Sequence, residues 1–305
     1  MMNKKYPKLR VMAQNGMMLL RESIHLTFFM PCDQSIAGPA TAKALDTYIQ
    51  AIGSAQTLGL FPDEEGEWQP LDDKELASTR EKFQGQTGCW VILKSRDPID
   101  ERFAVTYRSW THVRLPSEGG ANSICAVSFL LPTEFMEEQG PRRIRELAMA
   151  LAASLPFSSG YGGLVFNCEL DLLSVPDIVR PLCFRYPGMD FIEISILSRY
   201  MGDRLRASSW LTFLGPVAVE QLGGVQRLRE HLTAPETHVE ELQPGHVLIS
   251  LGEWPEAGDT RQGDTLPAYR ELARILEPRL FHQPDFRNYL FPPEEWRRWE
   301  RRFLD

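Results

Sequence analysis

Apolar and polar side chains alternate along much of the first half of the chain, as half-buried strands require. The alternation is clearest at 23–29, and short apolar runs follow at 89–93, 103–110 and 123–131. Turn-forming residues, such as those at 97–98, separate the last three runs. Runs joined by connections this short predict an antiparallel meander.

A spacing of three to four residues between apolar side chains marks the helices. It predicts helices at 40–52, 141–155, 217–222, 225–232 and 267–276. Two further apolar runs, at 239–242 and 246–251, flank a Pro-Gly pair and predict a β-hairpin. Residues 61–82 are rich in acidic residues and interrupt the pattern, so we interpret them as an acidic insertion with the character of a solvated loop.

Strands and helices in this order predict an α+β fold in which helices cover antiparallel sheets. In the predicted C-terminal helix, Trp296, Trp299 and Phe303 share one face and should dock on the body of the protein. We expect a peripheral N-terminal segment at 1–18, one α+β domain at 19–280 and the docked helix at 281–305. The domain should form two closely packed subdomains, at 19–170 and 171–280.

A glycine-rich stretch at 156–163 precedes an apolar run at 164–168. Three glycines so close together indicate either positive φ angles or a surface that another chain approaches closely. We interpret the stretch as a tight turn between a helix and a buried strand. A second exposed turn is expected around 187–188, where Pro is followed by Gly.

Composition and charge restrict the class of protein. The 305 residues are 43% hydrophobic and 24% charged, as in ordinary soluble proteins, and the net charge is −8. An acidic surface disfavours direct binding of nucleic acid and favours a basic partner. The five cysteines form no Cys-x-x-Cys motif and predict buried thiols in a reducing compartment. No apolar run approaches the ~20 residues of a membrane span, and none follows the N-terminal lysines, so we expect a cytoplasmic protein.

Catalytic and metal-binding motifs do not emerge from the pattern. The six histidines lack the spacing of metal ligands, and the glycine-rich stretch matches neither a dinucleotide-binding loop, a P-loop nor a nucleophile elbow. We therefore predict no catalytic residue, no cofactor and no metal. A serine-based active site assembled from distant residues stays open as an alternative, and its place would be the Ser158–Gly163 turn.

Two stretches, 61–73 and 253–259, combine carboxylates with tryptophan, and we predict that they contact a partner. A tryptophan folded back on the core and a solvated acidic loop are the structural alternatives. Two residues on the predicted turns, Tyr161 and Arg185, are added as contacts. The predicted partner-binding residues are Asp63, Glu64, Glu65, Glu67, Trp68, Asp72, Asp73, Tyr161, Arg185, Glu253, Trp254, Glu256 and Asp259.

Four stretches in order resemble a bacterial family of type VI secretion immunity proteins, TsiV. They read SGYGGLVFN at 159–167, FRYPGMD at 184–190, SWLTFLG at 209–215, and GEWPEAGD at 252–259 followed by LPAY at 266–269. Their order and spacing match the family over roughly 20–280, which is most of the chain.

The resemblance implies a cognate inhibitor that binds an incoming effector toxin and protects the producing cell. Partners of such proteins are often DNA-degrading toxins of the restriction-endonuclease-like type, and a protein of net charge −8 suits a basic DNA-binding cleft. We expect the protein to occlude the active site of its toxin. The alternatives are an enzyme of unknown chemistry and an adaptor subunit of the secretion apparatus.

Overall fold

The computed structural model describes residues 6–54, 57–63, 65–95, 102–112, 123–170, 172, 174–282 and 290–305. The chain forms two compact units, each built from segments distant in sequence. Unit 1 comprises Met1–Ile24, Tyr161–Ile192 and Arg204–Asp305, and unit 2 comprises His25–Gly160 and Glu193–Asp203. The division at 170–171 suggested by the sequence stays a prediction.

The strands of unit 2 form an antiparallel meander, as predicted. Three of them pair in chain order, with Val91 opposite Tyr107 and Tyr107 opposite Val127. Side chains at 91–94 and 105–108 alternate between buried and accessible positions, whereas the apolar run at 125–132 is buried along most of its length. From one edge to the other the order is β2 (Met18–Met30, which belongs to unit 2 from His25 on), β7 (Cys125–Pro132), β6 (Ala104–Arg108), β5 (Trp90–Ser95), β3 (Leu58–Pro62) and β4 (Trp68–Pro70).

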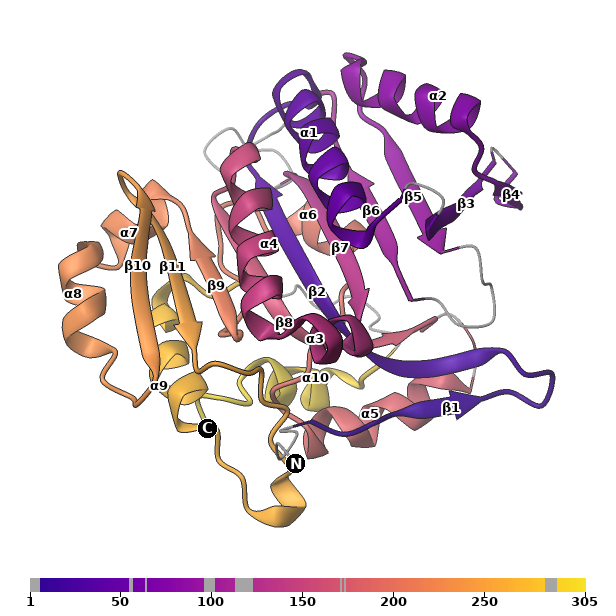
Figure 1. Ribbon diagram of the computed structural model, residues 1–305. Coiled ribbons are helices and arrows are strands. Elements are labelled where there is room, and N and C mark those ends of the chain that lie inside the picture. The colour runs from indigo at the N-terminus through magenta and orange to yellow at the C-terminus, as the bar shows by residue number, and fades with distance from the viewer. Residues whose placement is uncertain are drawn as a thin grey trace. The chain divides into compact units, whose positions relative to one another are not determined.

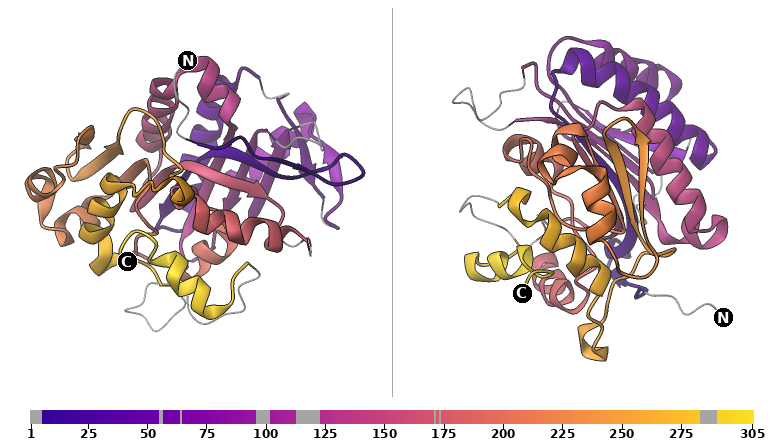
Figure 2. Two further views of the ribbon diagram at one scale, coloured as in Figure 1. Left: turned by 90° about the horizontal axis from the view of Figure 1, so that it is seen from below. Right: turned by 90° about the vertical axis from the view of Figure 1, so that its left-hand side faces the viewer.

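Helices cover one face of these strands, and Figures 1 and 2 show α1 and α4 side by side over them. Beneath the helices, Tyr48 packs on Phe129 with ring centroids 5.2 Å apart, and Phe83 packs edge-on against Tyr107 at 5.3 Å. All four of these rings are fully buried. The helices of unit 2 are α1 (Gln34–Ile52), α2 (Asp73–Gln84), α3 (Thr133–Gln139), α4 (Pro141–Ser154) and α6 (Ile194–Tyr200).

Helix α1 begins six residues before the predicted start at residue 40. Gly38 and Pro39 lie inside the helix, where a Cβ on Gly38 would overlap the carbonyl oxygen of Phe83. Buried Gln34 joins the first turn to its neighbours, since its amide donates to Phe83 O at 3.0 Å and accepts from Tyr107 Oη at 2.8 Å. Tertiary contacts therefore extend the helix beyond its sequence signal.

The solvated loop predicted at 61–82 is wrong. These residues form part of β3, all of β4 and most of α2. Strands β3 and β4 form an antiparallel hairpin in which Pro62 pairs with Trp68. Leu76 and Phe83 bury the inner face of α2, whereas Asp73 and Glu81 are exposed. The insertion is thus an ordered edge of the sheet.

The strands of unit 1 include the predicted hairpin, which is confirmed: β10 pairs with β11, with Val239 opposite Ile249. The tight turn predicted at 156–163 is wrong, because most of that stretch belongs to a ten-residue strand, β8. In unit 1 the strand order is β10 (Thr237–Gln243), β11 (His246–Leu251), β9 (Leu211–Leu214) and β8 (Ser159–Cys168, in unit 1 from Tyr161 on), with β1 (Arg10–Met12) paired to the first half of β2.

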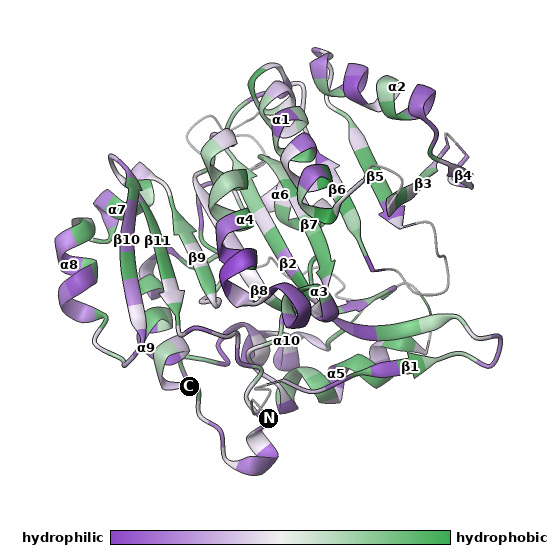
Figure 3. Cartoon of the chain, in the orientation of Figure 1, coloured by the Kyte–Doolittle hydropathy of each residue, from purple (hydrophilic) through white to green (hydrophobic). Residues whose placement is uncertain are grey.

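The helices predicted in unit 1 are present, including the C-terminal one. Trp296, Trp299 and Phe303 are buried, with at most 6% of each side chain exposed, which confirms the docked face. Figure 3 shows the contrasting surface of α8, which is largely hydrophilic. The helices are α5 (Val175–Arg185), α7 (Pro216–Gln221), α8 (Gly224–His231), η3 (Thr260–Gln262), α9 (Pro267–Leu276), η4 (Glu277–Arg279) and α10 (Pro293–Glu300).

Antiparallel strands and covering helices confirm the predicted α+β class. Among the helices of the described residues, none has both the length and the apolar character that crossing a membrane requires.

Candidate functional site

The four stretches behind the family resemblance meet in unit 1. Strand β8 and the turn after α5 exchange hydrogen bonds, from Asp190 N to Leu164 O (3.0 Å) and from Phe166 N to Asp190 O (2.8 Å). The same turn contacts the loop after β11 through Gly188 N and Ala257 O (2.7 Å). The indole of Trp210 donates to Gly252 O at 3.1 Å, which joins β9 to that loop. The stretches therefore build one framework.

Gly163 in β8 is there for close packing. Ser209 donates to Gly162 O at 2.8 Å, and a Cβ on Gly163 would stand 2.8 Å from the same hydroxyl oxygen. Neither glycine has a positive φ. Close packing against Ser209 of the same chain, and not a positive φ, accounts for Gly163.

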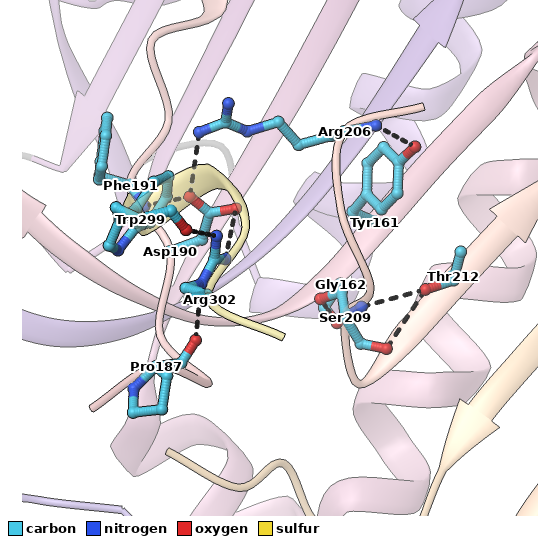
Figure 4. A network of polar contacts seen from close by, with 10 residues as sticks. All are labelled: Tyr161, Gly162, Pro187, Asp190, Phe191, Arg206, Ser209, Thr212, Trp299 and Arg302. Atoms are coloured by element: carbon cyan, nitrogen blue, oxygen red, sulfur yellow. Dashed lines mark hydrogen bonds and ion pairs between the residues drawn. The ribbon is translucent and has the colours of Figure 1, made fainter. Parts of the chain in front are cut away.

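Asp190 is the centre of a largely buried ionic cluster, shown in Figure 4. Its carboxylate pairs with Arg206 Nη2 at 3.3 Å and with Arg302 Nη2 at 3.7 Å. Arg302 also donates to Pro187 O at 2.9 Å and lies 3.8 Å from the ring centroid of Trp299. Burial lowers the pKa of Arg302 to about 10, and Asp190 opposes that shift. The cluster fixes the C-terminal residues to the framework.

Tyr161 belongs to this interior. The exposed turn predicted for it is wrong, because the side chain is 3% exposed in β8. Its hydroxyl accepts a hydrogen bond from Arg206 N at 2.7 Å. A side chain in this position holds the fold and is not accessible to a partner.

A pocket of about 630 Å³ opens where the turn after α5 meets the loop before α9. Arg185 and Asp259 form a bidentate ion pair in its wall, with distances of 3.0 Å (Nε–Oδ1) and 2.7 Å (Nη2–Oδ2). The carboxylate also accepts from Arg261 N and Gln262 Nε2. Other residues that line the pocket include Tyr6, Tyr186, Glu256, Asp264 and Leu266.

The ion pair determines the electrostatics of this wall. Hydrogen bonding by Arg185 lowers the pKa of Asp259 and raises the pKa of Arg185 itself. The two residues were predicted as separate partner contacts, yet the structure pairs them with each other. Their charges are compensated within the chain. In the same predicted segment, Glu253 is exposed, whereas Trp254 and Glu256 are half-buried.

The loop that carries Asp259 has a fixed backbone. Leu266 adopts a positive φ of 50°, which is uncommon for leucine, directly before α9. Its side chain is buried against Gly258, where a Cβ would lie 2.8 Å from Leu266 Cγ. Asp264 accepts from Asp259 N at 2.8 Å and closes the loop. The pocket wall is therefore preorganised.

The other predicted acidic stretch lies in unit 2, in the β3–β4 hairpin. Asp63 organises its turn, since the carboxylate accepts from Glu65 N (3.0 Å), Glu67 N (2.9 Å) and Gln69 Nε2 (2.8 Å). These hydrogen bonds, above all the one from Gln69, lower the pKa of Asp63. Glu65 and Glu67 are exposed at the tip, and Glu64 lies outside the described residues.

Asp72 and Asp73 follow the hairpin at the start of α2. Asp72 is the N-cap residue, and its carboxylate accepts from Glu75 N at 2.8 Å. Asp73 is exposed in the first turn, where a negative charge suits the helix dipole. Asp63 and Asp72 thus position the exposed carboxylates beside them.

Two tryptophans of unit 2 are exposed to solvent. Trp68 was predicted as a contact and is 43% exposed, whereas Trp90 was missed and is 54% exposed. Lys94 Nζ lies 4.8 Å from the ring centroid of Trp68, and the guanidinium of Arg108 lies 5.4 Å from that of Trp90. The only sequence signal for Trp90 was its place on the more polar side of an alternating strand.

The turn at 158–163, predicted as the place of a serine-based active site, belongs largely to strand β8. Ser159 is 1% exposed at the start of β8, and Ser158 Oγ donates to Phe29 O at 3.3 Å. The described pocket with titratable side chains lies instead at Asp259. Within the part of the chain that the structure describes, no three His, Cys, Asp or Glu residues are placed to hold a metal ion.

Comparisons with known proteins give the family of the chain. A search of curated proteins found no match. The fold is similar to that of a solved structure described as Pseudomonas aeruginosa T6SS protein PA0821, with a TM-score of 0.75 and 15% sequence identity. That similarity covers 99% of this chain and 88% of the other. A family model described as type VI immunity for VRR-NUC matches residues 40–303, so the chain belongs to the TsiV family of type VI secretion immunity proteins.

Proposed function

We propose that this protein binds a VRR-NUC effector of the type VI secretion system and neutralises it by occluding its active site. The observation that carries the proposal is the family match over residues 40–303. The effector would act on DNA, so the encounter would take place in the cytoplasm. A net charge of −8 favours fast association with the basic cleft of a nuclease.

Unit 2 offers the contact surface that best suits this role. Glu65, Glu67 and Asp73 are exposed around one hairpin and helix start, and Asp63 and Asp72 hold the backbone that carries them. Preorganised carboxylates can replace DNA phosphates in a basic cleft at little conformational cost. Trp68 beside them supplies an aromatic anchor.

Coexpression with the effector tests the proposal. Bacteria that produce the effector alone should stop growing, and production of this protein should restore growth and yield a complex that copurifies. Failure to restore growth would contradict the function. Restored growth without a complex would replace binding by enzymatic reversal of damage, and a constitutive oligomer that does not affect toxicity would favour an adaptor.

A nuclease assay with purified components tests occlusion. The protein should abolish DNA cleavage at a 1:1 ratio and should compete with DNA for the effector. An inhibited complex that still binds DNA with unchanged affinity would contradict occlusion and would place the inhibitory contact outside the cleft.

A further inference from the structure

The exposed tryptophans of unit 2 share one face of the sheet. Trp90 and Lys94 lie four residues apart on β5 and therefore point to the same side, and the register places Arg108 directly opposite Trp90. Trp68 joins this side, since its ring lies beneath Lys94 Nζ. We call the surface formed by Trp68, Trp90, Lys94 and Arg108 the aromatic–cationic face.

The opposite side of the same strands is the core. Val91 and Leu93 alternate with the residues of the aromatic–cationic face and are at most 5% exposed. Tyr107 is fully buried against Phe83 of α2. Trp90 is therefore exposed on the well-packed pair of strands β5 and β6, and its exposure does not come from a loosely packed core.

The charge on this face is positive and is held by the rings. The guanidinium of Arg108 lies near two indoles, 5.4 Å from the ring centroid of Trp90 and 4.9 Å from that of Trp110. In the described part of the chain Arg108 forms no ion pair. A cation fixed over aromatic rings without a carboxylate partner is suited to receive one from another molecule.

We propose that the aromatic–cationic face docks the effector through an apolar effector surface that carries carboxylates. The inference rests on the proposed function and adds to it a second contact of opposite sign beside the acidic hairpin. Tryptophan and arginine are the residues most enriched among those that dominate interface energetics. Single-stranded nucleic acid could also stack on indoles, but Glu65 and Glu67 at the adjoining hairpin tip and the net charge of −8 repel phosphates.

Equilibrium binding to the purified effector tests the proposal with three variants, Trp90→Ala, Arg108→Glu and Arg108→Lys. We expect Arg108→Glu to weaken binding by about 30-fold or more and Trp90→Ala by about tenfold, as for central interface residues. Arg108→Lys keeps the charge but loses the planar fork, so its loss should be smaller than that of Arg108→Glu.

Matched controls come from other exposed positions in unit 2. Ile36→Ala removes an exposed apolar side chain of α1, and Arg142→Glu reverses an exposed charge of α4. Both should bind within about twofold of the wild type, since they lie outside the face. Unchanged thermal midpoints in all five variants establish that each is folded, and a face variant that fails this check is replaced by Trp68→Ala.

The outcomes separate the two proposals. If the wild-type protein does not bind the effector, the proposed function fails and this inference fails with it. If the wild type binds and the face variants bind equally well, the function stands and the face is overturned. Binding of a labelled single-stranded oligonucleotide that is lost in Trp90→Ala, with effector binding unchanged, would also overturn the proposal in favour of nucleic acid.

Discussion

The ionic cluster of unit 1 and the aromatic–cationic face of unit 2 use the same residue types for different ends. In unit 1, Arg302 stacks on Trp299 and pairs with Asp190 within the chain. In unit 2, Arg108 stacks on Trp90, which is 54% exposed, and has no ion pair among the described residues. Where a carboxylate of the same chain pairs with the arginine, the stacked arginine and tryptophan stabilise the fold. Where no such carboxylate pairs with it, the two side chains are available to a partner.

The comparison extends to the acidic residues. Asp259 is compensated by Arg185 in the pocket wall, whereas Glu65 and Glu67 remain exposed at the hairpin tip. The sequence stretches that resemble the TsiV family concentrate in the compensated region. Family motifs here mark the framework, and the proposed contacts lie elsewhere. Four experiments test this contrast.

The largest effect should come from removing the buried indole of unit 1. Trp299→Ala deletes a fully buried ring that packs 4.7 Å from Phe191 and beneath Arg302, and should lower the free energy of unfolding by about 3–5 kcal/mol. Urea denaturation measures this loss of stability. Trp68→Ala, which truncates an exposed indole, is the control and should cost about 0.5 kcal/mol. Equal losses would refute the distinction.

Removing the shared carboxylate should have the next largest effect. Asp190→Ala leaves Arg206 and Arg302 buried without their common partner, and should cost about 3 kcal/mol. Arg108→Ala removes a cation that forms no ion pair with another described residue, and it should cost much less. Thermal and urea denaturation of both variants give the comparison. A neutral Asp190→Ala would show that the cluster is not structural.

The pocket wall predicts a pH dependence. The pKa of Asp259 is lowered in the folded protein by Arg185, so the ion pair stabilises the fold above the ordinary pKa of an aspartate. That contribution is lost as the pH falls through the lowered value. The thermal midpoint of wild type should therefore drop more between pH 5 and pH 3 than that of Asp259→Asn. Parallel curves for the two proteins would contradict the assignment.

The smallest effect on stability should come from the hairpin tip. Reversing Glu65 and Glu67 to lysine should change the free energy of unfolding by about 0.5 kcal/mol or less, because both are exposed. Effector association should slow at low salt, and the difference should shrink as salt is raised. Stopped-flow measurements at two ionic strengths give the association rates of the variant and the wild type. Unchanged rates at low salt would remove the tip from the interface.

Much of the fold could be predicted from residue spacing. The alternation in β5 and β6 and the helical stripes of α4 and α9 arise from one buried face each, so they can be recognised in sequence. Gly163 shows where prediction from residue spacing fails. A glycine needed for the close approach of Ser209 and a glycine needed for a turn look the same in sequence, and only the fold distinguishes them.

The candidate site was less predictable, because it depends on what each charge meets in space. Asp63 and Glu65 look equivalent in sequence, yet one is enclosed by hydrogen bonds and the other faces water. The pairing of Arg185 with Asp259 joins residues 74 positions apart. Trp90 belongs to an ordinary strand, and its exposure depends on which elements cover that side of the sheet.

Amide hydrogen exchange of this protein, alone and with its effector, tests the central claim most directly. The account predicts that the effector protects the β3–β4 hairpin and strands β5 and β6, while exchange in β8 and β9 of the unit 1 framework stays unchanged. A stable complex in which the hairpin and both strands exchange as in the free protein would contradict it.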